Sequence, residues 1–274
     1  MIKQKQMNYL KFLYASFITP NREIAEIFED FGLIEYKHMM WAMNDMVKNG
    51  VEFDMDIDSL RDLKSENVNE LIQKLISQIE QSLKNTNTKG IEENTLRRFK
   101  NDEEYMLDVL KSLDDDSKIT AFDEHKTLKN IPITPEQAEA FNFFLIGETY
   151  KEYELITIYS YLKAHIQDNV EAVNCFTDLI SDSIYHLKRF AKFAAELGTL
   201  TFVRSVEKEK YQNVEISEFL KENIEEEIGA EKECLILAEK IGNDELSKFL
   251  LFISRQEVYH AELLERALKH LKDS

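Results

Sequence analysis

The chain has 274 residues, a formal net charge of −18 at pH 7, and only 7 glycines and 3 prolines. A sheet-rich fold of this length needs many turns built from glycine and proline, so the composition excludes it and predicts an all-α fold. The negative charge repels phosphate backbones and anionic lipid surfaces. We therefore expect neither nucleic acid nor a membrane as a partner.

The two cysteines, Cys175 and Cys234, lie far apart in the sequence and form no C-x-x-C motif. This excludes a cysteine-ligated zinc ribbon or rubredoxin-type iron site within the chain and indicates a reducing compartment. The sequence has no run of about 18 apolar residues, and its first residues carry no apolar stretch typical of a secretory signal. We therefore expect a cytoplasmic location.

Apolar residues recur at three- and four-residue spacing along the chain, which predicts helices over 3–18, 20–49, 59–84, 92–113, 135–166, 169–198, 217–241 and 244–272. An acidic and polar stretch follows the fourth helix. Thr134 to Gln137 then form a capping box with Pro135 at the first helical position. Ser217 and Asn243 are the predicted caps of the last two helices. The predicted organisation is a domain over 1–115, a linker over 116–134 and a domain over 135–274.

The two predicted domains repeat one another. A shift of 148 residues places 28–50 over 176–198 without a gap. Shifts of 156 and 154 residues place 65–72 over 221–228 and 102–110 over 256–264. Three matches in the same order predict an internal duplication, with one four-helix bundle in each copy.

The links between the second and third helices differ in predicted length. Residues 199–216 span more than about 50 Å when extended, enough to cross a helix of about 25 residues. Such a link is typical of the single long crossover in ferritin-like bundles. The matching link, 51–58, reaches only about 26 Å. The first copy therefore has either a shorter third helix or a different crossover.

Carboxylates and histidines of the second copy fall on faces that should point into its core. Glu257 and His260 share a helix face at i, i+3 spacing, although this pair alone is a weak signal. Under the repeat alignment, Glu227 and Glu231 lie over Leu71 and Leu75, Asp182 lies over Ile34 one turn before His186, and Glu152 lies over Gln4. Carboxylates at core positions are costly unless they are compensated, and a divalent cation is the usual compensation.

This set of residues resembles the di-iron carboxylate centres of ferritin-like proteins, especially rubrerythrins and bacterioferritins. The resemblance covers the second copy, and it implies two iron ions, or manganese, bound by Glu152, His186, Glu227, Glu257 and His260. The family places a carboxylate three residues before the histidine of its second helix, and this chain has Ser183 there. Asp182 is the available substitute and Glu231 an additional candidate ligand, so either two metals with altered bridging or one metal is expected.

The first copy retains only part of this pattern. Glu35, His38 and Glu103 remain, while Met106 replaces the last histidine. We interpret this copy as a degenerate bundle without a dinuclear site, in which His38 is hydrogen-bonded in the core and Met106 fills space.

The resemblance implies an oxidoreductase that reacts with peroxide or dioxygen, or that oxidises Fe(II). Electrons would then come from a separate donor or from Fe(II) itself. The alternative is a non-catalytic helical module for protein interaction or iron binding, which Ser183 and the degenerate first copy favour. Ferritin-like bundles commonly pair, so a homodimer is one expectation. Two bundles within one chain would also meet that need.

Overall fold

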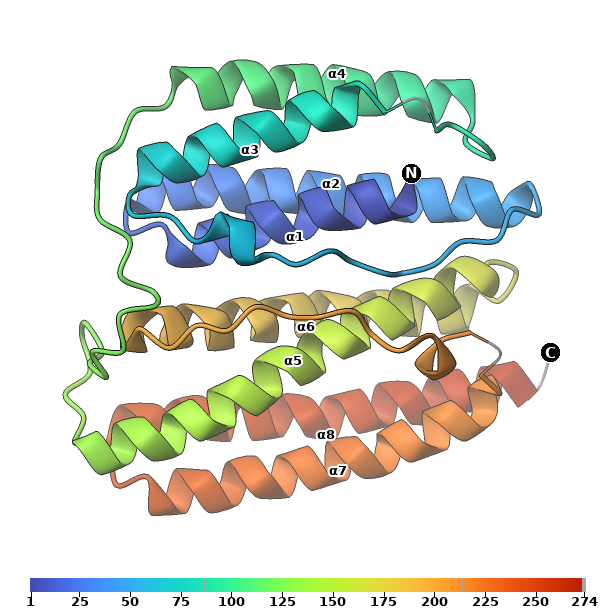
Figure 1. The fold of residues 1–274 in the computed structure, drawn as a ribbon. Coiled ribbons are helices and arrows are strands. Elements are labelled where there is room, and N and C mark those ends of the chain that lie inside the picture. The colour runs from blue at the N-terminus through green and yellow to red at the C-terminus, as the bar shows by residue number, and fades with distance from the viewer. Residues whose placement is uncertain (86, 213, 273–274) are drawn as a thin grey trace. The chain divides into compact units, whose positions relative to one another are not determined.

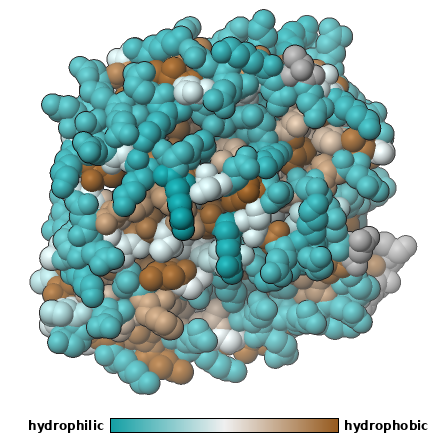
Figure 2. All heavy atoms as spheres, in the orientation of Figure 1, coloured by the Kyte–Doolittle hydropathy of each residue, from teal (hydrophilic) through white to brown (hydrophobic). Residues whose placement is uncertain are grey.

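The computed structural model describes residues 1–85, 87–212 and 214–272. Their regular structure is helical, with one isolated antiparallel bridge between Asn67 and Lys118 and no strand among the described residues. The predicted all-α class is confirmed. Among the described residues, no helix combines the length and apolar character needed to cross a membrane. On the face drawn in Figure 2 most surface residues are hydrophilic, as a sequence with 31% charged residues requires.

The chain divides into two compact units. Unit 1 contains residues 1–123 and 200–206, and unit 2 contains residues 124–199 and 207–274. This division differs in two places from the sequence-based domains 1–115 and 135–274. The predicted linker is shared between the units, and seven residues of the later connection belong to unit 1.

Unit 1 consists of four helices: α1 (Ile2–Ile18), α2 (Arg22–Lys48), α3 (Val68–Leu83) and α4 (Glu93–Ser112). α1 packs on α2 and α3, and α4 packs on α2 and α3, which closes a four-helix arrangement. Figure 1 shows that α2 and α3 run parallel, because the connection between them returns along the unit.

The predicted helix over 59–84 was wrong at its start. α3 begins at Val68, where the Asn67 side chain accepts a hydrogen bond from the Glu70 backbone N–H. Residues before it form an extended segment and a short 3-10 turn, Arg61–Leu63. Met55 and Ile57 are buried at two-residue spacing in this segment, which is the periodicity of extended backbone. The third helix of unit 1 is therefore shorter than that of unit 2. This is the first of the two alternatives expected from the lengths of the links.

Unit 2 consists of α5 (Pro135–His165), α6 (Val170–Leu197), α7 (Ile216–Lys240) and α8 (Asp244–Lys272), with a short 3-10 turn at Lys208–Lys210. α6 packs on α5 and α8, and α8 also packs on α7. α6 and α7 run parallel (Figure 1). The connection before α7 has 18 residues, 198–215, and the one before α3 has 19, 49–67, so the two are nearly equal in length.

The predicted helix starts in unit 2 are confirmed with one exception. Thr134 and Gln137 form the expected capping box, and Asn243 accepts hydrogen bonds from the first turn of α8. Ser217 is not the cap of α7. The side chain of Glu215 caps that helix by accepting from the Glu218 backbone N–H, because α7 begins one residue earlier, at Ile216.

Candidate metal centre

Five side chains with metal-binding atoms meet inside unit 2, and each of its four helices supplies at least one. Every one of them is less than 5% exposed. Ile253 and Leu264 of α8 are equally buried, so the face that carries Glu257 and His260 points inward, as the spacing predicted. The five are Glu152 of α5, His186 of α6, Glu227 of α7, and Glu257 and His260 of α8.

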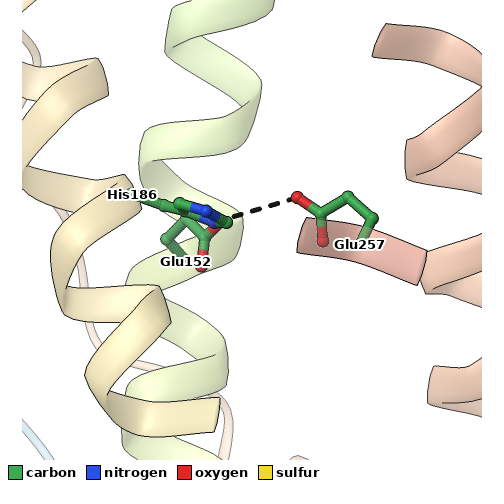
Figure 3. A group of neighbouring side chains, drawn as sticks. All are labelled: Glu152, His186 and Glu257. Atoms are coloured by element: carbon green, nitrogen blue, oxygen red, sulfur yellow. Dashed lines mark hydrogen bonds and ion pairs between the residues drawn. The ribbon is translucent and has the colours of Figure 1, made fainter. Parts of the chain in front are cut away.

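The first half of the cluster joins α5, α6 and α8. His186 Nδ1 lies 2.8 Å from Glu152 Oε1 and 3.8 Å from Glu257 Oε1. In Figure 3 the imidazole overlaps the Glu152 carboxylate, and Glu257 approaches it from α8 along the dashed ion pair. One ligand atom from each of the three residues falls within 4.8 Å of the others, a spacing that suits one metal ion.

The second half joins α7 and α8. His260 Nδ1 lies 3.1 Å from Glu257 Oε2 and 3.7 Å from Glu227 Oε2. These three residues also offer ligand atoms within 4.8 Å of one another. Glu257 belongs to both halves, with Oε1 directed to His186 and Oε2 to His260. A carboxylate shared in this way can bridge two metal ions.

Burial and close charges shift the proton equilibria of the cluster. Burial lowers the pKa of His186, but Glu152 and Glu257 outweigh this effect and raise it to about 9. Burial raises the pKa of Glu257 to about 8, with help from Glu227 and Glu152. Burial would also raise the pKa of Glu227, but its contact with His260 holds it below the ordinary value. Without a metal, protons therefore neutralise part of the buried charge.

One carboxylate oxygen at the centre lacks a partner. Among the described residues, none donates a hydrogen bond to Glu152 Oε2, although this atom is buried. A buried carboxylate oxygen without a donor is costly, and a cation beside it removes that cost. Carboxylate and imidazole donors suit Fe²⁺, Mn²⁺ and Zn²⁺. The residues present therefore fit a metal.

The outer nitrogen of each histidine has its own partner. His186 Nε2 lies 2.9 Å from Gln256 Oε1, and His260 Nε2 lies 3.3 Å from Asp182 Oδ2. Such contacts fix the orientation of the ring and leave Nδ1 directed at the centre. The structure thus places Asp182 on the far side of the His260 ring from Glu257 and Glu227, in neither of the two ligand groups.

The remaining predicted residues also lie outside the two groups. Glu231 is half-buried one turn beyond Glu227. Ser183, where the family pattern has a carboxylate, is 2% exposed. Sequence reasoning missed Glu148, which stands one turn before Glu152. Burial, with the nearby Glu152 charge, raises its pKa to about 7. The i, i+4 spacing of Glu148 and Glu152 was the signal that could have found it.

A surface cavity of about 320 Å³ lies between α5 and α7. Its lining includes Asn223, which is one turn before Glu227 and accepts a 3.4 Å hydrogen bond from the Tyr159 hydroxyl. Glutamates dominate the rest of the lining, among them Glu154, Glu222 and Glu226. The cavity is therefore acidic and reaches the helix turn next to a candidate ligand.

Unit 1 has a buried polar cluster of different composition. Glu35, His38 and Glu103 are all buried, as are Gln78 and Ser82 on α3. His38 Nδ1 contacts Glu35 Oε1 at 3.3 Å, and its Nε2 contacts Asp102 Oδ2 at 3.0 Å, so His38 is hydrogen-bonded in the core as predicted. Met106 of α4 is fully buried, as expected of a space-filling residue.

The residues of α3 that reach this cluster are not the ones that the sequence alignment matched to Glu227 and Glu231. Gln78 and Ser82 reach it, whereas Leu71 and Leu75 had been placed opposite Glu227 and Glu231. Gln78 Nε2 donates to Asn8 Oδ1 at 2.8 Å, and Ser82 Oγ donates a short hydrogen bond to Glu103 Oε1. Sequence reasoning also missed Lys5, whose side chain lies inside the cluster.

Comparison with known proteins adds no relative. No protein-family model, curated protein or solved structure matches this chain. The assignment of function therefore rests on the geometry of the centre.

Proposed function

We propose that unit 2 is a ferritin-like bundle that binds two metal ions, iron or manganese, and acts as an oxidoreductase on peroxide or dioxygen. The observation that carries this proposal is Glu257, which directs one oxygen to the His186 group and the other to the His260 group. Each group adds one more carboxylate, Glu152 or Glu227. The result is a symmetric donor set for two adjacent ions.

We also propose that unit 1 is a second copy of the same bundle. In both units a histidine of the second helix contacts a residue of the fourth helix through Nε2: His38 with Asp102, and His186 with Gln256. In both units an aromatic ring of the first helix meets a phenylalanine of the second, Phe12 with Phe28 and Tyr159 with Phe176. Three of these positions are 148, 148 and 154 residues apart, in line with the sequence repeat. The ring pair on the first helices gives 147, one residue less than the shift that placed Glu152 over Gln4.

The protein's contribution to the reaction is a dry, fixed centre. Two adjacent metal ions, when bound, supply electrons for the reduction of an O–O bond, from Fe(II) itself or from a separate donor. Gln256 and Asp182 hold the two imidazoles in place through their outer nitrogens. Burial of all five donors keeps bulk water out. Glu148, with a pKa of about 7, is suited to exchange protons near neutral pH.

The acidic cavity between α5 and α7 is the proposed access route. It is an open space next to the turn that carries Glu227, and its glutamates attract cations. Most of these side chains are exposed, so they can exchange ions with solvent. A small oxidant would pass the same way, beside Asn223 and Tyr159.

The test is metal content and peroxide turnover of protein purified from iron-supplemented cells. We expect about two metal ions per chain and metal-dependent consumption of peroxide. The Glu257→Gln variant, which keeps the shape of the side chain, should bind less than one ion per chain and lose peroxide consumption. A wild type that takes up neither iron nor manganese would refute the proposal.

The second candidate is a non-catalytic iron-binding or interaction module. Ser183 favours it, because the family's second bridging carboxylate is missing there. Protein that binds two irons per chain but neither consumes peroxide nor oxidises Fe(II) would establish this alternative over the oxidoreductase.

A further inference from the structure

The buried cluster of unit 1 contains a positive charge that is part of the chain. Lys5 of α1 is 1% exposed. Its ammonium Nζ lies 2.6 Å from Glu103 Oε1 and 3.5 Å from Glu35 Oε2. It also lies 4.5 Å from the centre of the Phe99 ring, whose face attracts cations. The ammonium is thus held between two carboxylates in the core, as a bound cation would be.

Neutral donors complete the environment of these carboxylates. Asn8 Nδ2 donates to Glu35 Oε2 at 3.2 Å and to Glu103 Oε1 at 3.1 Å. Ser82 donates to Glu103, and His38 contacts the other oxygen of Glu35. Unit 2 differs here, since Glu152 Oε2 has no donor among the described residues. The unit 1 cluster is therefore satisfied by protein groups.

Position links Lys5 to the centre of unit 2. The ring pairs Phe12–Phe28 and Tyr159–Phe176 align α1 with α5 at a shift of 147 residues. The same shift places Lys5 at Glu152. The fourth helices, at a shift of 154, place Glu103 at Glu257. Where unit 2 has two carboxylates on these helices, unit 1 has one carboxylate and one ammonium.

We propose that the Lys5 ammonium occupies a cation site formed by Glu35 and Glu103, so that unit 1 is closed to metal ions while Lys5 is present. Removal of this amine exposes a divalent-cation site made of these two carboxylates, on α2 and α4. Loss of one partner from a buried ion group leaves uncompensated charge, which a metal ion can neutralise. This inference concerns unit 1 alone and does not require metal in unit 2.

The experiment uses the 274-residue chain with Glu257→Gln, so that unit 2 contributes little metal, and adds Lys5→Met to it. Methionine keeps most of the side-chain length without the charge. After equilibration with Mn²⁺ and removal of free ion, bound manganese should increase by about one ion per chain over the Glu257→Gln background. Mn²⁺ should also raise the unfolding temperature of the Lys5→Met protein and recover most of the decrease that the substitution causes.

The matched control removes one carboxylate as well, in Lys5→Met with Glu103→Gln. This protein should unfold at a higher temperature than Lys5→Met in the absence of metal, and should gain no manganese. The proposal is overturned if folded Lys5→Met protein takes up no additional Mn²⁺, or if it fails to fold and Mn²⁺ does not rescue it. It is also overturned if the control is as unstable as Lys5→Met or binds as much manganese, because packing or another site would then explain the result.

Discussion

Units 1 and 2 compensate the charge of their buried carboxylates in different ways. Each buries carboxylates and at least one imidazole between four helices. In unit 1 the ammonium of Lys5 lies among the carboxylates, and Asn8 and Ser82 donate to them. In unit 2 no lysine is among the buried polar residues described, and raised pKa values keep protons on His186 and Glu257 instead.

On the proposed function, this difference explains why the unit 2 cluster can accept metal ions and the unit 1 cluster cannot. A lysine side chain is a covalent part of the protein, and its ammonium compensates the charge of the carboxylates without any ion from solution. Protons are exchangeable, so a metal ion can displace them and take up the same oxygens and nitrogens. A buried carboxylate cluster is open to metal only while its countercharge can leave.

The largest expected effect comes from the residue shared by both ligand groups. Glu257→Gln should reduce bound metal from about two ions per chain to below one, because both ions lose a carboxylate oxygen. The counterpart substitution in unit 1, Glu103→Gln, should leave bound metal unchanged while it lowers the unfolding temperature. Elemental analysis of both variants measures this contrast, and equal losses of metal would contradict it.

A smaller effect is expected at Asp182. The structure places it against the outer nitrogen of His260, so Asp182→Ala should weaken metal binding by about 10- to 100-fold without lowering the saturating number of ions. Asp178→Ala, one turn earlier on the exposed face of α6, is the matched control and should have no effect. A lower stoichiometry at saturation would instead make Asp182 a ligand.

The smallest expected effect is a dependence of stability on pH in the metal-free protein. His186 and Glu257 have pKa values raised to about 9 and about 8, so between pH 6.5 and 9 the folded state binds more protons than the unfolded state. Each stabilisation is complete only below the ordinary pKa of the group, 4.5 for Glu257 and 6.5 for His186, and is lost progressively as the pH rises to the folded pKa. Glu227, with a lowered pKa, acts in the opposite direction but at acid pH.

Thermal unfolding of the metal-free protein should therefore move to lower temperature by several degrees from pH 6.5 to 9. Loaded with metal, the protein should not follow this trend, because the ion has replaced the protons. An increase in the unfolding temperature of metal-free protein over this range would show that the two groups are not protonated as described.

The sequence was sufficient to predict the all-α class and the inward face of α8, because both follow from spacing. The i, i+3 relation of Glu257 and His260 fixes a common face, and the apolar neighbours of His260 orient it. The same rule also groups Asp182 with His186. The rule does not say which helix faces Asp182 or which ring nitrogen Asp182 contacts. In the structure Asp182 contacts Nε2 of His260, the ring nitrogen that points away from the centre.

Two further features could not be read from periodicity. Leu71 and Leu75 are buried, but the α3 residues that reach the polar cluster are Gln78 and Ser82, each seven residues, or about two helical turns, further along the same face. Periodicity does not distinguish positions that share a face in this way. Lys5 lies in a polar N-terminal stretch that is typical of a solvated helix end, and its burial depends on carboxylates that are distant in the sequence.

The most direct test of this account is the position of manganese in crystals of the protein, located by its anomalous scattering. We expect two neighbouring ions in unit 2, one beside Glu152, His186 and Glu257 and the other beside Glu227, Glu257 and His260, with none in unit 1 near Lys5. A manganese ion bound by Glu35 or Glu103 while Lys5 is present, or no ion at Glu257, would contradict the account.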